Sequence, residues 1–216
     1  MSNDETSAPL ADHAGALAAA SPPVRKRPRP GERRVQILQT LAAMLEHPGG
    51  ERVTTAALAA RLEVSEAALY RHFASKAQMF EGLIEFIEQS VFTLVNQVLD
   101  LPGSGHEKAA RIVRLLMQFA EKNPGMTRVM VGDALVFENE RLQGRMNQFF
   151  DKLESMLRQA LRDAANASGS ATPTVDAQVR ASVLAAFVAG RLQRFARSGF
   201  RRMPSEHLEA GLALML

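Results

Sequence analysis

A short polar segment, Val64–Lys76, holds the side chains that are best suited to contact a nucleic acid. Ser65 and Ser75 each have the position of a helix N-cap, so the sequence predicts a helix of one to two turns between them. A helix this short is not stable alone. Three consecutive residues in it can hydrogen-bond phosphate oxygens: Tyr70, Arg71 and His72. A short, polar-tipped helix flanked by other helices is typical of one presented to the major groove of DNA.

Two short helices joined by a tight turn are predicted to position these side chains. The first is capped by Thr54 or Thr55 and runs to about Leu62. Glu63-Val64 forms the turn before the second helix, and this arrangement is a helix-turn-helix. The apolar periodicity predicts a helix over 32–46 before them and a long helix over 76–101 after them.

In a helix-turn-helix, the N-terminal end of the second helix meets base edges. Four residues occupy that end: Ser65, Glu66, Ala67 and Ala68. A glutamate can accept a hydrogen bond from cytosine, and an alanine can contact a thymine methyl. Contacts to the DNA backbone are predicted for Thr54, Thr55, Tyr70, Arg71, His72, Lys76, Arg33 and Arg34. The alternative is an ordinary surface helix whose polar groups are only solvated.

The composition favours an all-helical protein, because 46% of the 216 residues are hydrophobic, only 6% are aromatic and Ala and Leu are abundant. The chain has no Cys, which excludes disulfides, thiolate metal sites and a cysteine nucleophile. No two of its five histidines share an i,i+4 face, and no Gly-rich phosphate loop or nucleophile elbow occurs. We therefore expect no enzyme activity, no metal and no cofactor. No apolar run approaches the roughly 18 residues of a membrane span, and a cytoplasmic protein is expected.

Residues 1–30 are expected to form a disordered tail, because Ala, Ser and Pro dominate them. Basic residues gather at the end of this tail and the start of the first helix: Arg25, Lys26, Arg27, Arg29, Arg33 and Arg34, against the single acid Glu32. Two interpretations are open. The segment is either a solvated tail or an arm that lies along phosphates or enters the minor groove.

These motifs resemble the DNA-binding domain of the TetR family. The likeness is carried by Thr54–Leu62, by Val64–Phe73, by Ser75-Lys76 and by the spacing to the long helix. It implies a TetR-like all-α fold with a basic-ended tail over 1–30, a helix-turn-helix domain over 31–75 and a helical dimerisation and partner-binding domain over 76–216. Glu63 is a departure, because the family usually has glycine in this turn. A non-glycine residue with positive φ carries a conformational cost.

Further segments resemble one branch of this family, the nucleoid occlusion factors: Ser65–Phe73, Leu83–Glu88, Asn123–Gly125 and Arg141–Gln148. The resemblance covers most of residues 31–203. It implies a dimer that binds palindromic chromosomal DNA at the nucleoid and inhibits ring assembly by the division protein FtsZ, with no obligatory small-molecule ligand. Two other functions remain open: a TetR-type repressor released by a small molecule in the C-terminal bundle, and an adaptor protein with incidental basic charge.

The resemblance also implies an FtsZ-binding groove between the long helix and the next one, predicted over 107–122. It places this groove near Phe86, Leu115 and Asn123. The other predicted partner-binding residues, Leu94, Gln118 and Lys122, differ from members of the branch. Independently, Phe86 lies about 100° and Phe92 about 140° from the apolar stripe centred on Ile87, a stripe that also includes Leu94. The long helix is therefore either buried on two sides by its own domain, or Phe86 belongs to an exposed interaction patch.

The helix predicted over 175–198 has two apolar faces. One carries Val179, Val183, Ala186, Phe187 and Gly190, and the other carries Leu184, Val188, Leu192 and Phe195. A helix that is apolar on two faces needs two neighbours. One neighbour can be its own bundle and the other the same helix of a second subunit, with Ala186 and Gly190 permitting close approach. The predicted homodimer interface is Val183, Ala186, Phe187 and Gly190, and the two half-sites on DNA would lie about 34–36 Å apart.

Overall fold

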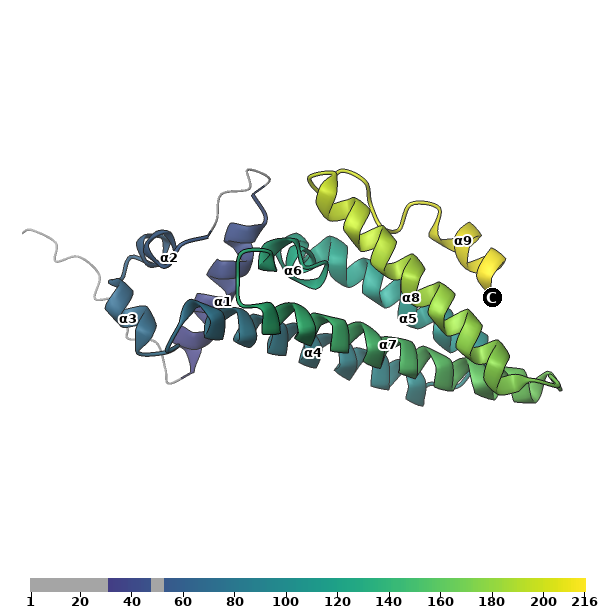
Figure 1. Cartoon of the computed structure of the whole chain (residues 1–216). Helices are drawn as coiled ribbons and strands as arrows, with labels where there is room; N and C mark the ends of the chain where they lie inside the picture. The colour runs from purple at the N-terminus through teal and green to yellow at the C-terminus, as the bar shows by residue number, and fades with distance from the viewer. Residues whose placement is uncertain (1–30, 48–52) are drawn as a thin grey trace, which may run out of the picture.

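The computed structural model of the chain describes residues 31–47 and 53–216, so the tail and its basic residues up to position 30 lie outside the described residues. The described part is all-helical, as predicted: α1 (Glu32–Leu45), α2 (Thr55–Arg61), α3 (Glu66–Tyr70), α4 (Lys76–Asp100), α5 (Gly105–Lys122), α6 (Pro124–Met130), the 3-10 turn η1 (Asp133–Leu135), α7 (Glu140–Ala167), α8 (Pro173–Arg197) and α9 (Leu208–Met215). Helices α1–α3, called the reading head below, lie at one end (Figure 1). The long helices α4, α5, α7 and α8 run away from them as an elongated bundle (Figure 1). No helix of the described residues is both long enough and apolar enough to cross a membrane.

Side-chain oxygens cap the helices around the reading head where the sequence predicted them. The three caps are Thr54, which accepts from Ala57 N at 3.1 Å, Ser65, which accepts from Ala68 N at 3.3 Å, and Ser75, which accepts from Gln78 N at 3.2 Å. Gln78 closes the capping box one residue early, because its Oε1 accepts from Ala74 N at 2.8 Å. These caps satisfy amide groups that α2, α3 and α4 leave unpaired at their first turns.

The turn between α2 and α3 is left-handed, although a glutamate stands where the family usually has glycine. Glu63 adopts φ of 54°, in the left-handed region. Its amide donates to Ala60 O at 3.1 Å, and Val64 N donates to Ala59 O at 3.0 Å, which ends α2 sharply. A non-glycine residue in this region costs on the order of 1 kcal/mol. The turn is therefore formed at the expense of local strain.

Two prolines begin helices instead of separating them. Pro124 is the first residue of α6 and Pro173 the first of α8, which begins two residues before its predicted start at 175. Proline suits this position because its missing N–H would be unpaired there anyway. Helix α6 is short, because it ends at Met130 and Gly132, at φ of 79°, turns the chain into η1.

Two glycines let neighbouring helices pack with their backbones in direct contact. A Cβ on Gly125 would lie 1.9 Å from the carbonyl oxygen of Ala42, so α6 rests directly on α1. A Cβ on Gly105 would lie 1.9 Å from the carbonyl oxygen of Ala160, so α5 begins against α7.

The buried side chains form one continuous cluster from α1 to α9, and α4 supplies residues along most of its length. Phe92 is buried, with its ring centroid 5.0 Å from that of Phe149 on α7. Leu94 is 41% exposed, so its predicted place in the core is wrong. The buried face of α4 rotates toward Phe92 and Val95 along the helix, because α7 covers that side. Helix α4 is therefore buried on two sides near Phe92 but exposes Phe86.

Candidate nucleic-acid interface and partner-binding face

Helix α3 is anchored by its apolar residues and presents its polar ones. Leu69 and Phe73 are buried, whereas Tyr70 is 45% exposed. Four further predicted contact residues are exposed: Glu66, Ala67, Arg71 and His72. Ala68 is half-buried. Helices α2 and α3 lie together at the end of the molecule farthest from α8 and α9 (Figure 1), so this surface can approach a duplex without the bundle in the way.

Several predicted DNA-contacting groups already have partners within the chain. The hydroxyl of Thr55 donates to Glu66 Oε2 at 2.5 Å, so α2 and α3 are tied together at their N-terminal ends. The oxygens of Thr54 and Ser65 accept backbone amides as caps, which leaves each hydroxyl hydrogen available to donate to a phosphate. Because the bond from Thr55 uses Oε2, Glu66 can still accept from a base through Oε1.

Arg34 of α1 contacts the residues that follow α3. Its Nη1 donates to the carbonyl oxygen of His72 at 2.9 Å, and its guanidinium lies 4.0 Å from the centroid of the Phe73 ring. Arg33 points along α1, where Nη1 donates to Gln36 Oε1 at 2.8 Å. The structure therefore gives Arg34 a positioning role for α3, which the sequence did not indicate.

Lys76, predicted to contact phosphate, is paired with an acid from the far side of the chain. Its Nζ lies 2.5 Å from Oε1 of Glu138, which stands just before α7. The two side chains are only 20% and 8% exposed. No feature of the sequence predicted this contact, because 62 residues separate its partners.

The residues proposed for a protein partner occupy exposed faces of two neighbouring helices. On α4, Phe86 and Leu94 are 44% and 41% exposed, and their spacing of eight residues puts them on one face. On α5, Gln118 and Lys122 are exposed and Leu115 is half-buried at helical spacing from them. Helices α4 and α5 pack against each other. Asn123 ends α5, where its side-chain amide donates to Phe119 O at 2.8 Å.

Ion pairs hold the opposite side of α4 against α7. Arg145 donates to both oxygens of Glu88, at 3.2 and 2.6 Å, and Arg141 pairs with Glu81. The hydrogen bond to Glu88 raises the pKa of the Arg145 guanidinium, burial opposes this shift, and the charges of Glu88, Glu85 and Glu81 add to the increase. Helix α4 is thus fixed in orientation, with Phe86 held outward.

Helix α8 has one buried face and one exposed apolar face. Its residues Leu184, Val188, Leu192 and Phe195 are buried, as predicted. The opposite face carries Val175, Val179, Val183, Ala186 and Gly190, and all of these are exposed. Phe187 lies between the two faces, beneath Arg191 and close to Gly211 of α9. It contacts its own chain, so it fits the predicted dimer face less well than its neighbours do.

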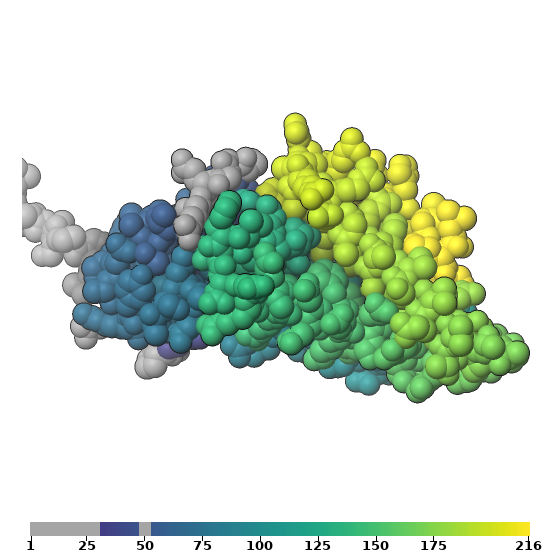
Figure 2. Space-filling view, in the orientation of Figure 1, coloured from purple at the N-terminus to yellow at the C-terminus, as the bar shows by residue number. Residues whose placement is uncertain are grey.

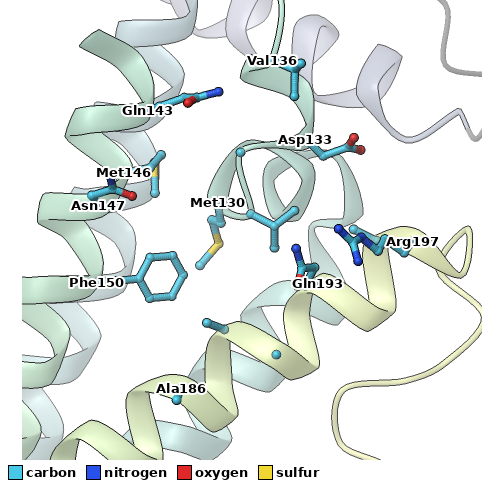
Figure 3. Close-up of a pocket in the computed structure, with 15 residues that line it drawn as sticks. Met130, Asp133, Val136, Gln143, Met146, Asn147, Phe150, Ala186, Gln193 and Arg197 are labelled. Carbon is cyan, nitrogen blue, oxygen red and sulfur yellow. The ribbon is translucent and has the colours of Figure 1, made fainter. Parts of the chain in front are cut away.

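The exposed face of α8 borders an open hollow between α6–η1, α7 and α8. Its volume is about 770 Å³, and its apolar lining includes Met130, Val131, Met146, Phe150, Ala186 and Gly190. Figure 3 shows Met130 of α6 and Phe150 of α7 directed into the same space. Gln143, Asn147, Gln193 and Arg197 contribute polar groups to the wall. The size suits a small molecule, and the position is continuous with the apolar face of α8.

Replacing Tyr70 with alanine is expected to weaken binding to every duplex by a similar factor, about 0.5–1.5 kcal/mol per protomer, because a phosphate contact carries no sequence information. The measurement is fluorescence anisotropy with a duplex selected by the protein from random sequence and with a scrambled duplex. Ala67→Ser is the matched change at the base-facing end, and it should alter the ratio of the two affinities. Equal loss on both duplexes for both variants would contradict the assignment.

Comparisons with known proteins agree with the geometry. The family described as bacterial regulatory proteins of the tetR family matches residues 37–83, and an SlmA-like, tetracyclin repressor-like C-terminal domain matches residues 106–216. The chain is 50% identical over 183 residues to the nucleoid occlusion factor SlmA of Idiomarina loihiensis, covering 85% of this chain and 93% of that one. It is 51% identical over 178 residues to SlmA of Photobacterium profundum, covering 82% and 90%.

Solved structures confirm the fold. The regulator FadR from Bacillus subtilis, in complex with stearoyl-CoA, superposes with a TM-score of 0.68 at 12% identity, covering 84% of this chain and 96% of that one. A TetR-like regulator from Rhodococcus gives a TM-score of 0.68 at 20% identity, covering 88% and 97%. Proteins of this family are DNA-binding regulators and not enzymes, as predicted. The chain therefore belongs to the TetR family and, within it, to the SlmA branch of nucleoid occlusion factors.

Proposed function

We propose that this chain is a homodimer that binds palindromic chromosomal sites at the nucleoid and, when bound, inhibits assembly of the FtsZ ring there. Residues 31–75 act as its DNA-binding part and residues 76–216 as its dimerisation and partner-binding part. The observation that carries the proposal is the exposed apolar face of α4, formed by Phe86 and Leu94, in a chain of the SlmA branch. An apolar patch on a helix that its own bundle otherwise buries is typical of a protein-binding site.

Helix α4 joins the two activities in one rigid element. Lys76, at its start, closes the reading head, and Phe86 lies ten residues further on, about 15 Å along the helix axis. The pairs Arg145–Glu88 and Arg141–Glu81 hold the helix against α7. A DNA-dependent shift of the first turn of α4 would therefore be carried along the helix to the face with Phe86.

The test is sedimentation of FtsZ polymers formed with GTP, in the presence of the chain and a duplex that it binds. The unmodified chain is expected to reduce the sedimented FtsZ. Phe86→Ala should leave the affinity for the duplex unchanged and restore the FtsZ pellet, because it removes only an exposed apolar contact. Leu214→Ala, an exposed apolar residue on α9, is the matched control and should inhibit as the unmodified chain does. An undiminished FtsZ pellet with the unmodified chain and its duplex would sink the proposal.

The hollow beside α8 supports a second candidate, a repressor that a small molecule releases from DNA. Its volume of about 770 Å³ and the apolar side chains of Met130, Met146 and Phe150 in its wall would suit an apolar ligand with a polar end near Gln193 and Arg197. The FtsZ sedimentation assay distinguishes the two functions. A ligand-released repressor leaves the FtsZ pellet unchanged with or without DNA, and it loses its duplex when an apolar ligand is added.

A further inference from the structure

We infer that Glu138 lowers the DNA affinity of this chain by competing with the DNA phosphates for Lys76. The inference rests on the proposed contact between Lys76 and phosphate. Glu138 lies outside the reading head, and it would affect DNA affinity without contacting DNA, through its contact with Lys76.

The contact encloses the charge of Lys76 within the protein. Nζ of Lys76 lies 2.5 Å from Glu138 Oε1 and 5.6 Å from the centroid of the Phe80 ring. Because the lysine and glutamate side chains are 20% and 8% exposed, the pair is screened by solvent less than an ordinary surface pair. In the unbound protein the ammonium group is therefore directed to a carboxylate, and not to the solvent in front of the reading head.

The position of Lys76 gives it access to both partners. Lys76 is the first residue of α4 and directly follows the Ser75 cap. It therefore lies six residues after the end of α3 at Tyr70. Its flexible four-carbon stem can carry the ammonium from one acceptor to another without moving the backbone. The surface of the segment before α7 lies directly against the reading head (Figure 2), so Glu138 meets Lys76 from a part of the chain outside the reading head.

The competition opposes DNA binding in two ways. A phosphate must first displace the carboxylate from the ammonium, which removes an ion pair of the unbound state. The released carboxylate of Glu138 then stands close to the negatively charged duplex, which adds repulsion. The hydrogen bond from Thr55 to Glu66 differs, because both of its members belong to the reading head. Glu138 instead comes from the loop whose Val136 lines the hollow beside α8, so a change in that loop can reach the DNA contact.

The experiment measures the affinity of the full chain for its selected duplex at one salt concentration, using fluorescence anisotropy. Glu138→Gln keeps the shape of the side chain and removes its charge. It is expected to tighten binding about 2- to 5-fold per protomer, the range of a partly exposed ion pair, and therefore about 4- to 25-fold for a dimer. Glu140→Gln is the matched control, because it removes an exposed acid two residues away, and it should change affinity less than 2-fold. Unchanged or weaker binding by Glu138→Gln, or an equal effect of Glu140→Gln, overturns the inference.

Lys76→Gln separates this inference from the role proposed for Lys76. It should weaken binding and lower the log–log salt slope by about 1.8 for the dimer, since two phosphate contacts are lost. In the Lys76→Gln background, Glu138→Gln should tighten binding less than it does in the unmodified chain, because only the repulsion between the carboxylate and the duplex is left to relieve. No change of the slope in Lys76→Gln refutes the phosphate contact itself. A reduced slope without tighter binding by Glu138→Gln refutes only the competition.

Glu138→Asp tests the same contact independently, because it retracts the charge by one methylene. A smaller gain in affinity is expected, and any loss of affinity counts against the inference.

Discussion

Replacing Gly125 with alanine is expected to destabilise the protein by about 2–3 kcal/mol, because the new methyl group cannot fit between α6 and α1. Its Cβ would lie 1.9 Å from the carbonyl oxygen of Ala42 and 3.2 Å from Cγ of Glu46. The nearer atom belongs to the backbone of a helix, so it cannot rotate aside as a side chain could. Helix α6 must move away from α1, which also strains the hydrogen bond from Arg128 to Leu45 O at 3.3 Å.

The expected result is a fall of the unfolding midpoint by roughly 5–10 °C at fixed protein concentration, given 2–4 °C per kcal/mol for a chain of this size. Gly144→Ala is the control, because it makes the same change inside α7. A Cβ there would have no heavy atom of the described residues within 4 Å beyond its own helical neighbours. It should raise stability by about 0.5–1 kcal/mol through helix propensity alone. Equal midpoints for the two variants would mean that α6 does not pack on α1 as closely as the structure has it.

Local chemistry accounts for the part of the fold that could be predicted from the sequence. The caps at Thr54, Ser65 and Ser75 use bonds within three residues, and the helix starts around them follow directly. The sequence also indicated a strained turn at Glu63, because the TetR family usually has glycine there, and Glu63 does adopt positive φ. Such signals depend only on neighbours in the chain, which a single sequence contains.

The faces of the helices could be predicted less well, because other helices decide them. Leu94 belongs to the apolar stripe of α4 by spacing, but α7 covers the side with Phe92 and leaves Leu94 exposed. Phe187 shares a face with Val183 by periodicity, but the chain returns as α9 and packs beside its ring. Pro124 and Pro173 were ambiguous for a different reason. Proline is common both in breaks between helices and at the first helical position.

The candidate site divides in the same way. The exposure of Glu66, Ala67, Tyr70, Arg71 and His72 follows from the helix-turn-helix pattern. The partners of Lys76 and Arg34, by contrast, are Glu138 and the carbonyl of His72, which are 62 and 38 residues away in the chain. Neither contact has a sequence signal, because ion pairs and backbone acceptors at long range leave no periodicity. These contacts determine which groups of the reading head are available to DNA, so the energetics of the site could not be predicted from its residue types.

Placing a charge on the exposed face of α8 is expected to separate the dimer into protomers. Val175, Val179 and Val183 are 60%, 58% and 47% exposed, whereas the opposite face of the helix is fully buried. Val183→Asp would bring two carboxylates, one from each subunit, into an interface with no partner for either. Each unpaired buried charge costs at least about 2 kcal/mol, so the dimer dissociation constant should rise on the order of 10³-fold or more.

Sedimentation velocity over a range of protein concentrations measures this change, with Leu214→Asp on α9 as the matched control. Leu214 is 90% exposed, so the same charge there should leave the dimer intact. A monomeric Val183→Asp chain should also bind a palindrome no better than an isolated half-site, because each reading head then binds alone. Gly190→Ala tests close approach at the same face. A methyl group there meets no heavy atom of the described chain within 4 Å beyond its own helix, so it should stabilise an isolated protomer. A more stable protomer combined with a weaker dimer would locate the helix crossing at Gly190, whereas a Val183→Asp chain that remains dimeric would move the interface away from α8.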